Sequence, residues 1–234
     1  MKIVTSVDEK AWKLFVNSHP EGTVFQTPEM YEVFMRTKLM MPKHLYMIDN
    51  KEKILGLLSF LIIRQNNNLP SFASSRSIIW GAPLIAENKN KGKISNMLLD
   101  CYMKIIDNSV LFSEVRSSVF DLGDQSLFFN HGFLFEKHLN YLINLKEGKE
   151  KLWSNISKNR RKGINRAVKR FSLGLEEISS KKDLPEFYDL LKKTYSEVNV
   201  PILDYSFFDS LFDLVEKGMA NFFFAKDHQK RLAC

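Results

Sequence analysis

The residues with the clearest chemical potential are the cations between positions 149 and 170. This stretch holds nine Lys or Arg residues against one Glu, a local charge of +8, whereas the whole chain carries +7. The excess positive charge is therefore confined to one place. Cations concentrated in this way favour the binding of an anion, such as a phosphate or a carboxylate, more than diffuse charge does.

Within this stretch, four apolar residues recur at the spacing of one helix face: Ile164, Ala167, Val168 and Phe171. We predict an amphipathic helix over residues 157–171, with Ser157 or Asn159 as its capping residue. Arg160 and Arg161 lie within about 60° of Ile164, so we expect them to face the protein body. Near the free N–H groups of a helix N-terminus, two arginines can bind a phosphate or a carboxylate. The alternative is a surface helix whose arginines only lie along its edge.

Two successive sets of helices and strands must position these residues. The first set has predicted helices at 7–18, 29–38 and 91–108, strands at 43–48, 54–64, 77–80 and 111–116, a helix or turn at 124–131 and an extended region at 133–145. The second set has a strand at 173–178, helices at 184–198 and 207–217, a strand at 221–225 and a hairpin into 231–234.

Because this pattern restarts after Leu145, we predict an α+β fold with two domains, residues 1–148 and 149–234. The chain stops inside the last hairpin, so we expect the second domain to be incomplete. The strand at 221–225 should then present an unpaired edge and expose Phe222 to Phe224.

Composition limits the class of protein. The sequence is 44% hydrophobic and 12% aromatic, which is ample for a packed core. Its two cysteines, Cys101 and Cys234, have no metal-binding or redox spacing and indicate a reducing compartment. Acidic residues stand where a signal peptide would need an apolar run, and the longest apolar run, residues 54–63, is too short to span a bilayer. We therefore expect a cytoplasmic protein with no transmembrane segment and no metal site.

Three parts of the chain resemble a known family: Phe15 to Gly22 followed by Gln26; Trp80-Gly81-Ala82-Pro83-Leu84; and Tyr141 to Leu145 followed by Leu152-Trp153 and the pattern Arg161-x-x-Ile164-x-x-Ala167-x-Lys169. They resemble the Fem family, the non-ribosomal peptidyltransferases that build interpeptide bridges in bacterial peptidoglycan. The resemblance covers nearly the whole chain, and its most specific part is the pattern around Arg161.

The resemblance implies tandem GNAT-like acyltransferase domains with mixed or antiparallel sheets. It implies that Arg161 binds the pyrophosphate of a muropeptide precursor, with Arg160, Lys158, Asn159 and Asn165 beside it. The donor would be an aminoacyl-tRNA, or acyl-CoA as in looser relatives, and no bound cofactor is expected. The chain departs from the family on the helix after Gln26, where Met30 and Phe34 replace the usual Trp and Lys. The lysine half of the family's phosphate clamp is therefore missing.

The function predicted from these observations is aminoacyl or acyl transfer that forms an amide on a cell-envelope acceptor resembling a peptidoglycan precursor. Such a transfer needs positioning, a route for one proton and stabilisation of an oxyanion, so the sequence identifies no catalytic residue. A loop of the type that binds CoA is absent, which weakens acyl-CoA as the donor. Glu114 and Arg116 form either a site pair or, more commonly, a salt bridge at a strand edge.

Two alternatives to acyl transfer stay open at this point. The helix at 157–171 could serve a nucleic-acid-binding module, although no known nucleic-acid motif surrounds it. The chain could also be a catalytically silent fragment. The expected partners are a phosphate-bearing envelope precursor, either lipid-linked or nucleotide-linked, together with tRNA and a peripheral contact with the inner membrane.

Overall fold

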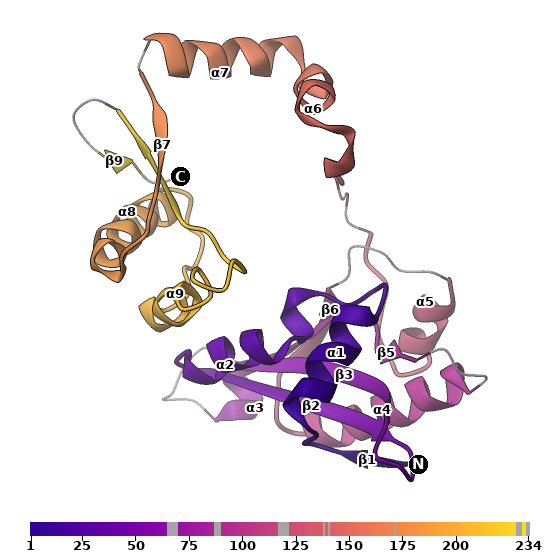
Figure 1. Cartoon of the computed structure of the whole chain (residues 1–234). Coiled ribbons are helices and arrows are strands. Elements are labelled where there is room, and N and C mark those ends of the chain that lie inside the picture. Colours follow the sequence, from indigo (N-terminus) through magenta and orange to yellow (C-terminus); the bar gives the residue numbers. More distant parts are fainter. Residues whose placement is uncertain are drawn as a thin grey trace. The chain divides into compact units, whose positions relative to one another are not determined.

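The computed structural model describes residues 1–64, 70–86, 90–116, 122–137, 139, 141–170, 172–227 and 231–232. Its chain divides into two compact units, residues 1–138 and 139–234 (Figure 1). This division falls ten residues before the one expected from the sequence, which placed the domains at 1–148 and 149–234. Each unit is described by itself below.

Unit 1 is built on a six-stranded mixed sheet. Its strands are β1 (Lys2–Val4), β2 (Met40–Ile48), β3 (Ile54–Arg64), β4 (Ser75–Trp80), β5 (Leu84–Ile85) and β6 (Phe112–Arg116). The order is β1-β2-β3-β4-β6, and β5 pairs with β3. All pairs are antiparallel except β4 with β6, which are parallel because a helix connects them. The α+β class with a mixed sheet, predicted from the sequence, is confirmed.

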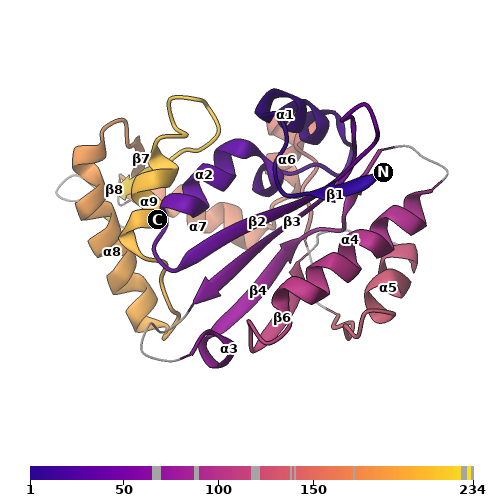
Figure 2. The same cartoon turned by 90° about the horizontal axis from the view of Figure 1, so that it is seen from below.

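Helices cover both faces of this sheet (Figure 2). They are α1 (Glu9–Ser18), the 3-10 turn η1 (Val24–Gln26), α2 (Pro28–Arg36), α3 (Ser71–Ser74), α4 (Lys91–Ile106) and α5 (Leu122–Phe129). On one face, Trp12 and Val16 of α1 pack against Tyr46 of β2. On the other, α4 buries its apolar side against β2 and β3, with Leu98 and Tyr102 fully covered. Unit 1 therefore has a three-layer core.

The packing of α4 depends on a missing side chain in β3. A Cβ atom at Gly56 would lie 2.9 Å from Ile85 Cδ1, 3.0 Å from Ile94 Cγ2 and 3.2 Å from Leu98 Cδ1. A side chain at position 56 would therefore require these three methyl groups to shift, and glycine lets α4 and β5 pack on the sheet without that shift.

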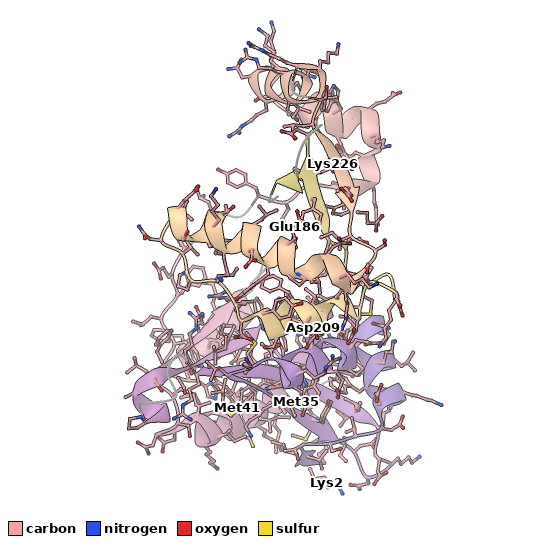
Figure 3. All side chains as sticks on the ribbon, turned by 90° about the vertical axis from the view of Figure 1, so that its left-hand side faces the viewer. Lys2, Met35, Met41, Glu186, Asp209 and Lys226 are labelled. Carbon is pink, nitrogen blue, oxygen red and sulfur yellow. The ribbon has the colours of Figure 1, made fainter. Side chains whose placement is uncertain are left out.

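Unit 2 contains a three-stranded antiparallel sheet, β7 (Gly174–Glu177), β8 (Phe223–Lys226) and β9 (Arg231–Leu232), in the order β7-β8-β9. Its helical elements are η2 (Leu145–Glu147), α6 (Lys149–Asn155), α7 (Lys158–Arg170), η3 (Lys181–Asp183), α8 (Leu184–Glu197) and α9 (Tyr205–Phe212). The core lies between this sheet and α8 and α9: it contains Ile178, Leu184, Phe187, Phe212, Phe222 and Phe224. In Figure 3, the labelled Lys226 lies on β8, where it forms an ion pair with Glu176 of β7 at 3.2 Å.

Two expectations for strands were wrong. Strand β8 was expected to have an unpaired edge and to expose Phe222 to Phe224, but β7 and β9 flank it and Phe222 and Phe224 are buried. Only Phe223 is exposed, because alternate residues of a strand point to opposite faces. In the described part of the extended region at 133–145 there is no strand, and Leu145 begins η2. The turn of the expected last hairpin, 228–230, and residues 233–234 lie outside the described residues.

Candidate functional site

Helix α7 carries all five of the site residues predicted from the sequence. It begins after Ser157, whose side-chain oxygen accepts a hydrogen bond from the backbone N–H of Arg160 at 3.4 Å. It ends at Arg170. Beyond it, Ser172 has a left-handed backbone (φ 50°), and the N–H of Leu173 donates back to the carbonyl of Ala167 at 3.2 Å. Both ends are therefore fixed by local contacts that a short sequence can encode.

The helix is a concentrated cationic surface. It carries seven Lys or Arg residues and no acidic residue: Lys158, Arg160, Arg161, Lys162, Arg166, Lys169 and Arg170. Within the described parts of the chain, the side chains of Arg160, Arg161 and Arg166 form no hydrogen bond or ion pair. Figure 3 shows nitrogen-tipped side chains projecting around the α7 ribbon. These guanidinium groups keep their donors available for an anionic ligand.

The geometry of α7 separates the predicted residues into faces. At about 100° per residue, Lys158 and Asn165 lie within about 60° of Arg161, on one face. Arg160 lies about 100° to one side, and Asn159 lies on the nearly opposite face. Arg161 is half-buried, while the other four are exposed. The structure thus brings Lys158, Arg161 and Asn165 together and leaves Asn159 apart from them.

The expected burial of the apolar stripe of this helix was wrong. Ile164 is 41% exposed and Val168 is 56% exposed, while Ala167 is half-buried. Phe171, the fourth residue of the stripe, lies outside the described residues. The spacing of apolar residues identifies the apolar face of a helix, but it does not supply a second element that covers this face.

A second cluster of polar and aromatic side chains lies in unit 1, around Gln26. Its side-chain oxygen accepts hydrogen bonds from the backbone N–H of Thr23 at 2.8 Å and from Thr23 Oγ1 at 3.1 Å. Its amide group donates to the backbone carbonyl of Trp80 at 3.1 Å. The indole N–H of Trp12 donates to the backbone carbonyl of Gln26 at 2.8 Å. Gln26 is buried and therefore holds η1 against the end of β4.

Trp80 is the centre of this cluster. Its ring stacks on that of Phe25, with centroids 4.2 Å apart and planes at 10°. The guanidinium carbon of Arg116 lies 5.7 Å from the Trp80 centroid, a cation–π arrangement. The N–H of Gly81, which has a left-handed φ of 81°, donates to the carbonyl of Arg116 at 2.8 Å. This turn joins the carboxyl ends of β4 and β6.

The carboxylate of Glu114 on β6 pairs with two arginines. Glu114 Oε1 contacts Arg116 Nη2 at 3.0 Å and Arg76 Nη1 at 3.5 Å. Two arginines on one carboxylate leave a net positive charge along β4 and β6, and Arg116 is the one that lies beside the Trp80 ring. The carboxyl ends of neighbouring parallel strands are common ligand sites. The pairing of Glu114 with Arg116 is thus an ion pair at a strand edge, and Arg76 extends it.

This cluster was not predicted as a site from the sequence, although Gln26, Trp80 and the pair of Glu114 with Arg116 were each noted separately. Gln26 and Trp80 are 54 residues apart, and no local pattern joins them. One signal was readable: Thr23-x-x-Gln26 has the spacing of a capping box, and the structure contains one. Met30 and Phe34, which replace the Trp and Lys usual in the Fem family, are buried in the core and present no cation.

Unit 1 also contains a buried pair of His44 and Ser59. The imidazole Nδ1 lies 2.8 Å from Ser59 Oγ, and Nε2 is buried with no hydrogen-bond partner in the described structure. The rings of Trp12 and Tyr31 lie with their centroids 4.5 Å and 4.8 Å from that of His44. Burial lowers the pKa of His44 to about 3, so the imidazole is neutral at physiological pH.

Among the described residues, no three His, Cys, Asp or Glu side chains are grouped so as to hold a metal ion. None of the helices that the structure describes combines the length and apolar character needed to cross a bilayer.

The fold is α+β with a mixed sheet, and it has counterparts among solved structures. The chain resembles the crystal structure of FemX, with a TM-score of 0.66 and 19% identity over 97% of this chain and 58% of the FemX chain. The crystal structure of a probable acetyltransferase has a TM-score of 0.44 and 15% identity, over 63% of this chain and 100% of its own. That of an aminoglycoside 6'-N-acetyltransferase from Acinetobacter haemolyticus has a TM-score of 0.42 and 14% identity, over 62% of this chain and 98% of its own. No family model and no curated protein sequence matches.

The likeness to FemX confirms the fold that the Fem resemblance implied. At 19% identity it shows the fold alone, and the chain spans 58% of the FemX chain. The residues that bind substrate must therefore be argued from their own geometry.

Proposed function

We propose that this chain takes part in aminoacyl or acyl transfer to an amine of a phosphate-bearing cell-envelope precursor, with Arg161 binding the phosphate. The observation that carries the proposal is the half-buried Arg161 of α7, with Lys158 and Asn165 on the same face and no partner for the guanidinium among the described residues. The FemX-like fold supports the reaction class, and the helix supports the kind of ligand.

The reaction places few demands on side-chain chemistry. The acceptor amine attacks the carbonyl carbon of an ester or thioester, and a tetrahedral oxyanion forms. Its collapse forms an amide bond, breaks the ester or thioester bond, and passes the amine's proton to the leaving alcohol or thiol. Positioning and oxyanion stabilisation supply most of the acceleration. Arg161 would therefore act by holding the acceptor rather than by transferring a proton.

The donor in this proposal is an aminoacyl-tRNA or acyl-CoA. The sequence lacks a CoA-binding loop of the Gln/Arg-x-x-Gly-x-Gly/Ala kind, which favours the aminoacyl-tRNA. The cations of α7 suit either donor, because both carry phosphate. We place the reaction on the cytoplasmic side of the inner membrane, where such precursors and tRNA are both accessible.

Calorimetric binding of a UDP-linked muropeptide tests the role of Arg161. Arg161→Ala should weaken binding by a factor of about ten to a hundred, corresponding to about 1.5–3 kcal/mol, because it removes a charge-assisted contact. Arg161→Lys should recover part of this loss, since lysine lacks the planar two-pronged contact. Arg166→Ala is the matched control: Arg166 is exposed, lies about 140° from Arg161 on the same helix, and should cost little.

Three outcomes would contradict the proposal. Equal losses for Arg161→Ala and Arg166→Ala would indicate diffuse electrostatics. Tighter binding of tRNA or duplex in the same assay, with the same equal losses, would favour the nucleic-acid-binding alternative. Absence of muropeptide binding by every form would remove the proposed acceptor and leave only the fold resemblance.

A further inference from the structure

The beginning of unit 2 exposes large apolar side chains beside its cations. Between residues 139 and 170, the described large apolar residues that are at least 40% exposed are Leu139, Tyr141, Leu142, Ile143, Leu145, Trp153, Ile164 and Val168. Exposed apolar side chains are common singly, but a run of this kind along one short segment marks an interaction surface.

The same segment is strongly basic. Residues 139–170 contain ten Lys or Arg and two Glu residues, a net charge of +8. On α7, Ile164 and Val168 are one turn apart, and Arg160 and Arg161 border them on the turn before. Long cationic side chains beside an apolar stripe can keep their charge at a polar surface while the stripe enters an apolar one.

This combination distinguishes between partners. A nucleic acid would use the cations of α7, but it would leave Ile164, Val168 and Trp153 exposed to water. An anionic bilayer uses both, because lipid phosphates pair with Lys and Arg while the acyl boundary accepts the apolar side chains. Trp153 on α6, 40% exposed, is of the type enriched at the membrane–water boundary.

We propose that residues 139–170 bind the surface of an anionic bilayer, with α7 lying in the plane of the interface and Ile164 and Val168 turned toward the acyl chains. This surface would place Arg161 at the level of the lipid phosphates. The inference deepens the proposed function only in this last respect, since it makes a lipid-linked acceptor accessible to Arg161. Binding to the bilayer itself does not depend on acyl transfer.

Co-sedimentation of the whole chain with vesicles tests the proposal. Vesicles of mixed phosphatidylglycerol and phosphatidylcholine should bind the protein, and vesicles of phosphatidylcholine alone should bind it far less. The triple variant Lys158→Gln, Arg160→Gln, Arg161→Gln should lower the partition coefficient on the order of a hundredfold, because these are the cations of α7 nearest the apolar stripe and each contributes near an anionic surface. The matched control is Lys10→Gln, Lys51→Gln, Lys93→Gln, which removes the same charge from exposed positions of unit 1 and should bind almost as the wild type does.

The apolar contribution separates a bilayer from other anions. Ile164→Ser with Val168→Ser should weaken vesicle binding by about tenfold and leave binding of tRNA unchanged. Both positions are exposed, so circular dichroism should show a folded variant. The salt dependence of the wild type needs no variant. Its binding to vesicles should weaken as salt rises from about 0.1 to about 0.5 M, and the part of the binding that comes from apolar contacts should remain.

Several results would overturn this inference. Unchanged vesicle binding by the charge variant or by the apolar variant would exclude the surface as described. Loss of vesicle binding in the presence of tRNA, with no effect of the apolar variant, would show that α7 is a nucleic-acid site. Failure of muropeptide binding with retained vesicle binding would reject the proposed acceptor and leave the membrane surface standing, so the two proposals fail separately.

Discussion

The cluster around Trp80 in unit 1 and the cations of α7 in unit 2 use polar groups in opposite ways. In unit 1, both ends of the Gln26 amide form hydrogen bonds, and Glu114 is shared between two arginines. On α7, Arg160, Arg161 and Arg166 have no partner among the described residues. The polar groups around Trp80 are used in hydrogen bonds and ion pairs within unit 1, whereas the donors of these α7 arginines stay available for a ligand.

This difference separates the two kinds of effect that substitutions should have. Removing a buried, fully bonded group leaves its partners unsatisfied and lowers the free energy of unfolding. Removing an exposed cation without a partner changes ligand binding and hardly changes stability. Stability measurements therefore test unit 1, and they give a negative control for α7.

The largest effect is expected for Gln26→Ala. The substitution leaves the N–H of Thr23 and the carbonyl of Trp80 without their partners and opens space in the core, so the free energy of unfolding should fall by about 3 kcal/mol. Denaturant titration followed by circular dichroism measures it. Asn17→Ala, at an exposed position of α1, should stay within about 0.5 kcal/mol of the wild type. A loss of less than about 1 kcal/mol for Gln26→Ala would show that the two regions do not differ in this way.

The buried His44 should make unit 1 sensitive to acid. Its pKa in the folded state is about 3, below the ordinary value of 6.5, so between these values the unfolded chain binds more protons. Stability is then fully present above pH 6.5 and falls as the pH is lowered, by up to about 1.4 kcal/mol per pH unit and about 2 kcal/mol at about pH 5.

Denaturant titrations of the wild type and of His44→Phe between about pH 7.5 and about pH 5 measure this dependence. The variant should lack most of the slope, whatever its stability at neutral pH. Parallel curves for the two proteins would mean that His44 is hydrated in solution and that the burial seen around Trp12 and Tyr31 is not maintained.

The smallest effect is expected within α7. A Cβ atom at Gly163 would meet nothing within 4 Å, so Gly163→Ala should raise the stability of the helix by about 0.5–1 kcal/mol through backbone entropy. The comparison is Gly148→Ala: that site is equally open, but its φ of 78° is left-handed, so the substitution should destabilise by about 1 kcal/mol. Thermal unfolding followed by circular dichroism measures both. Destabilisation by Gly163→Ala would reveal an element packed on α7 and would weaken the contrast with unit 1.

Elements defined by local signals were predictable from the sequence. Thr27 followed by Pro28 marks the start of α2, and the structure shows the Thr27 side chain accepting from the N–H of Met30. The start of α1, predicted at residue 7, was missed by two residues: Asp8 forms the cap, and the helix begins at Glu9. The short strands β1 and β5 were not predicted, because a strand of two or three residues is defined by its partner and not by its own pattern.

The candidate site also has one part that the sequence predicts and one part that it does not. The helix α7 could be predicted because its periodicity and its charge are both local. The cluster around Trp80 could not, because it depends on the parallel pairing of β4 with β6 and on a hydrogen bond across 54 residues. The exposure of Ile164 and Val168 could not be predicted either, since a sequence pattern describes one surface and its covering surface is encoded elsewhere.

The effect of a substitution at Gly56 should depend on the residues that pack around it. A larger residue there competes for space with the side chains of Ile85, Ile94 and Leu98, so its effect on stability should depend on the sizes of those three residues. Gly56 is also the register partner of Ile85, so a side chain at position 56 would press on β5 as well as on α4. The absent side chain near the start of β3 thus leaves room for β5, which begins three residues after the turn at Gly81.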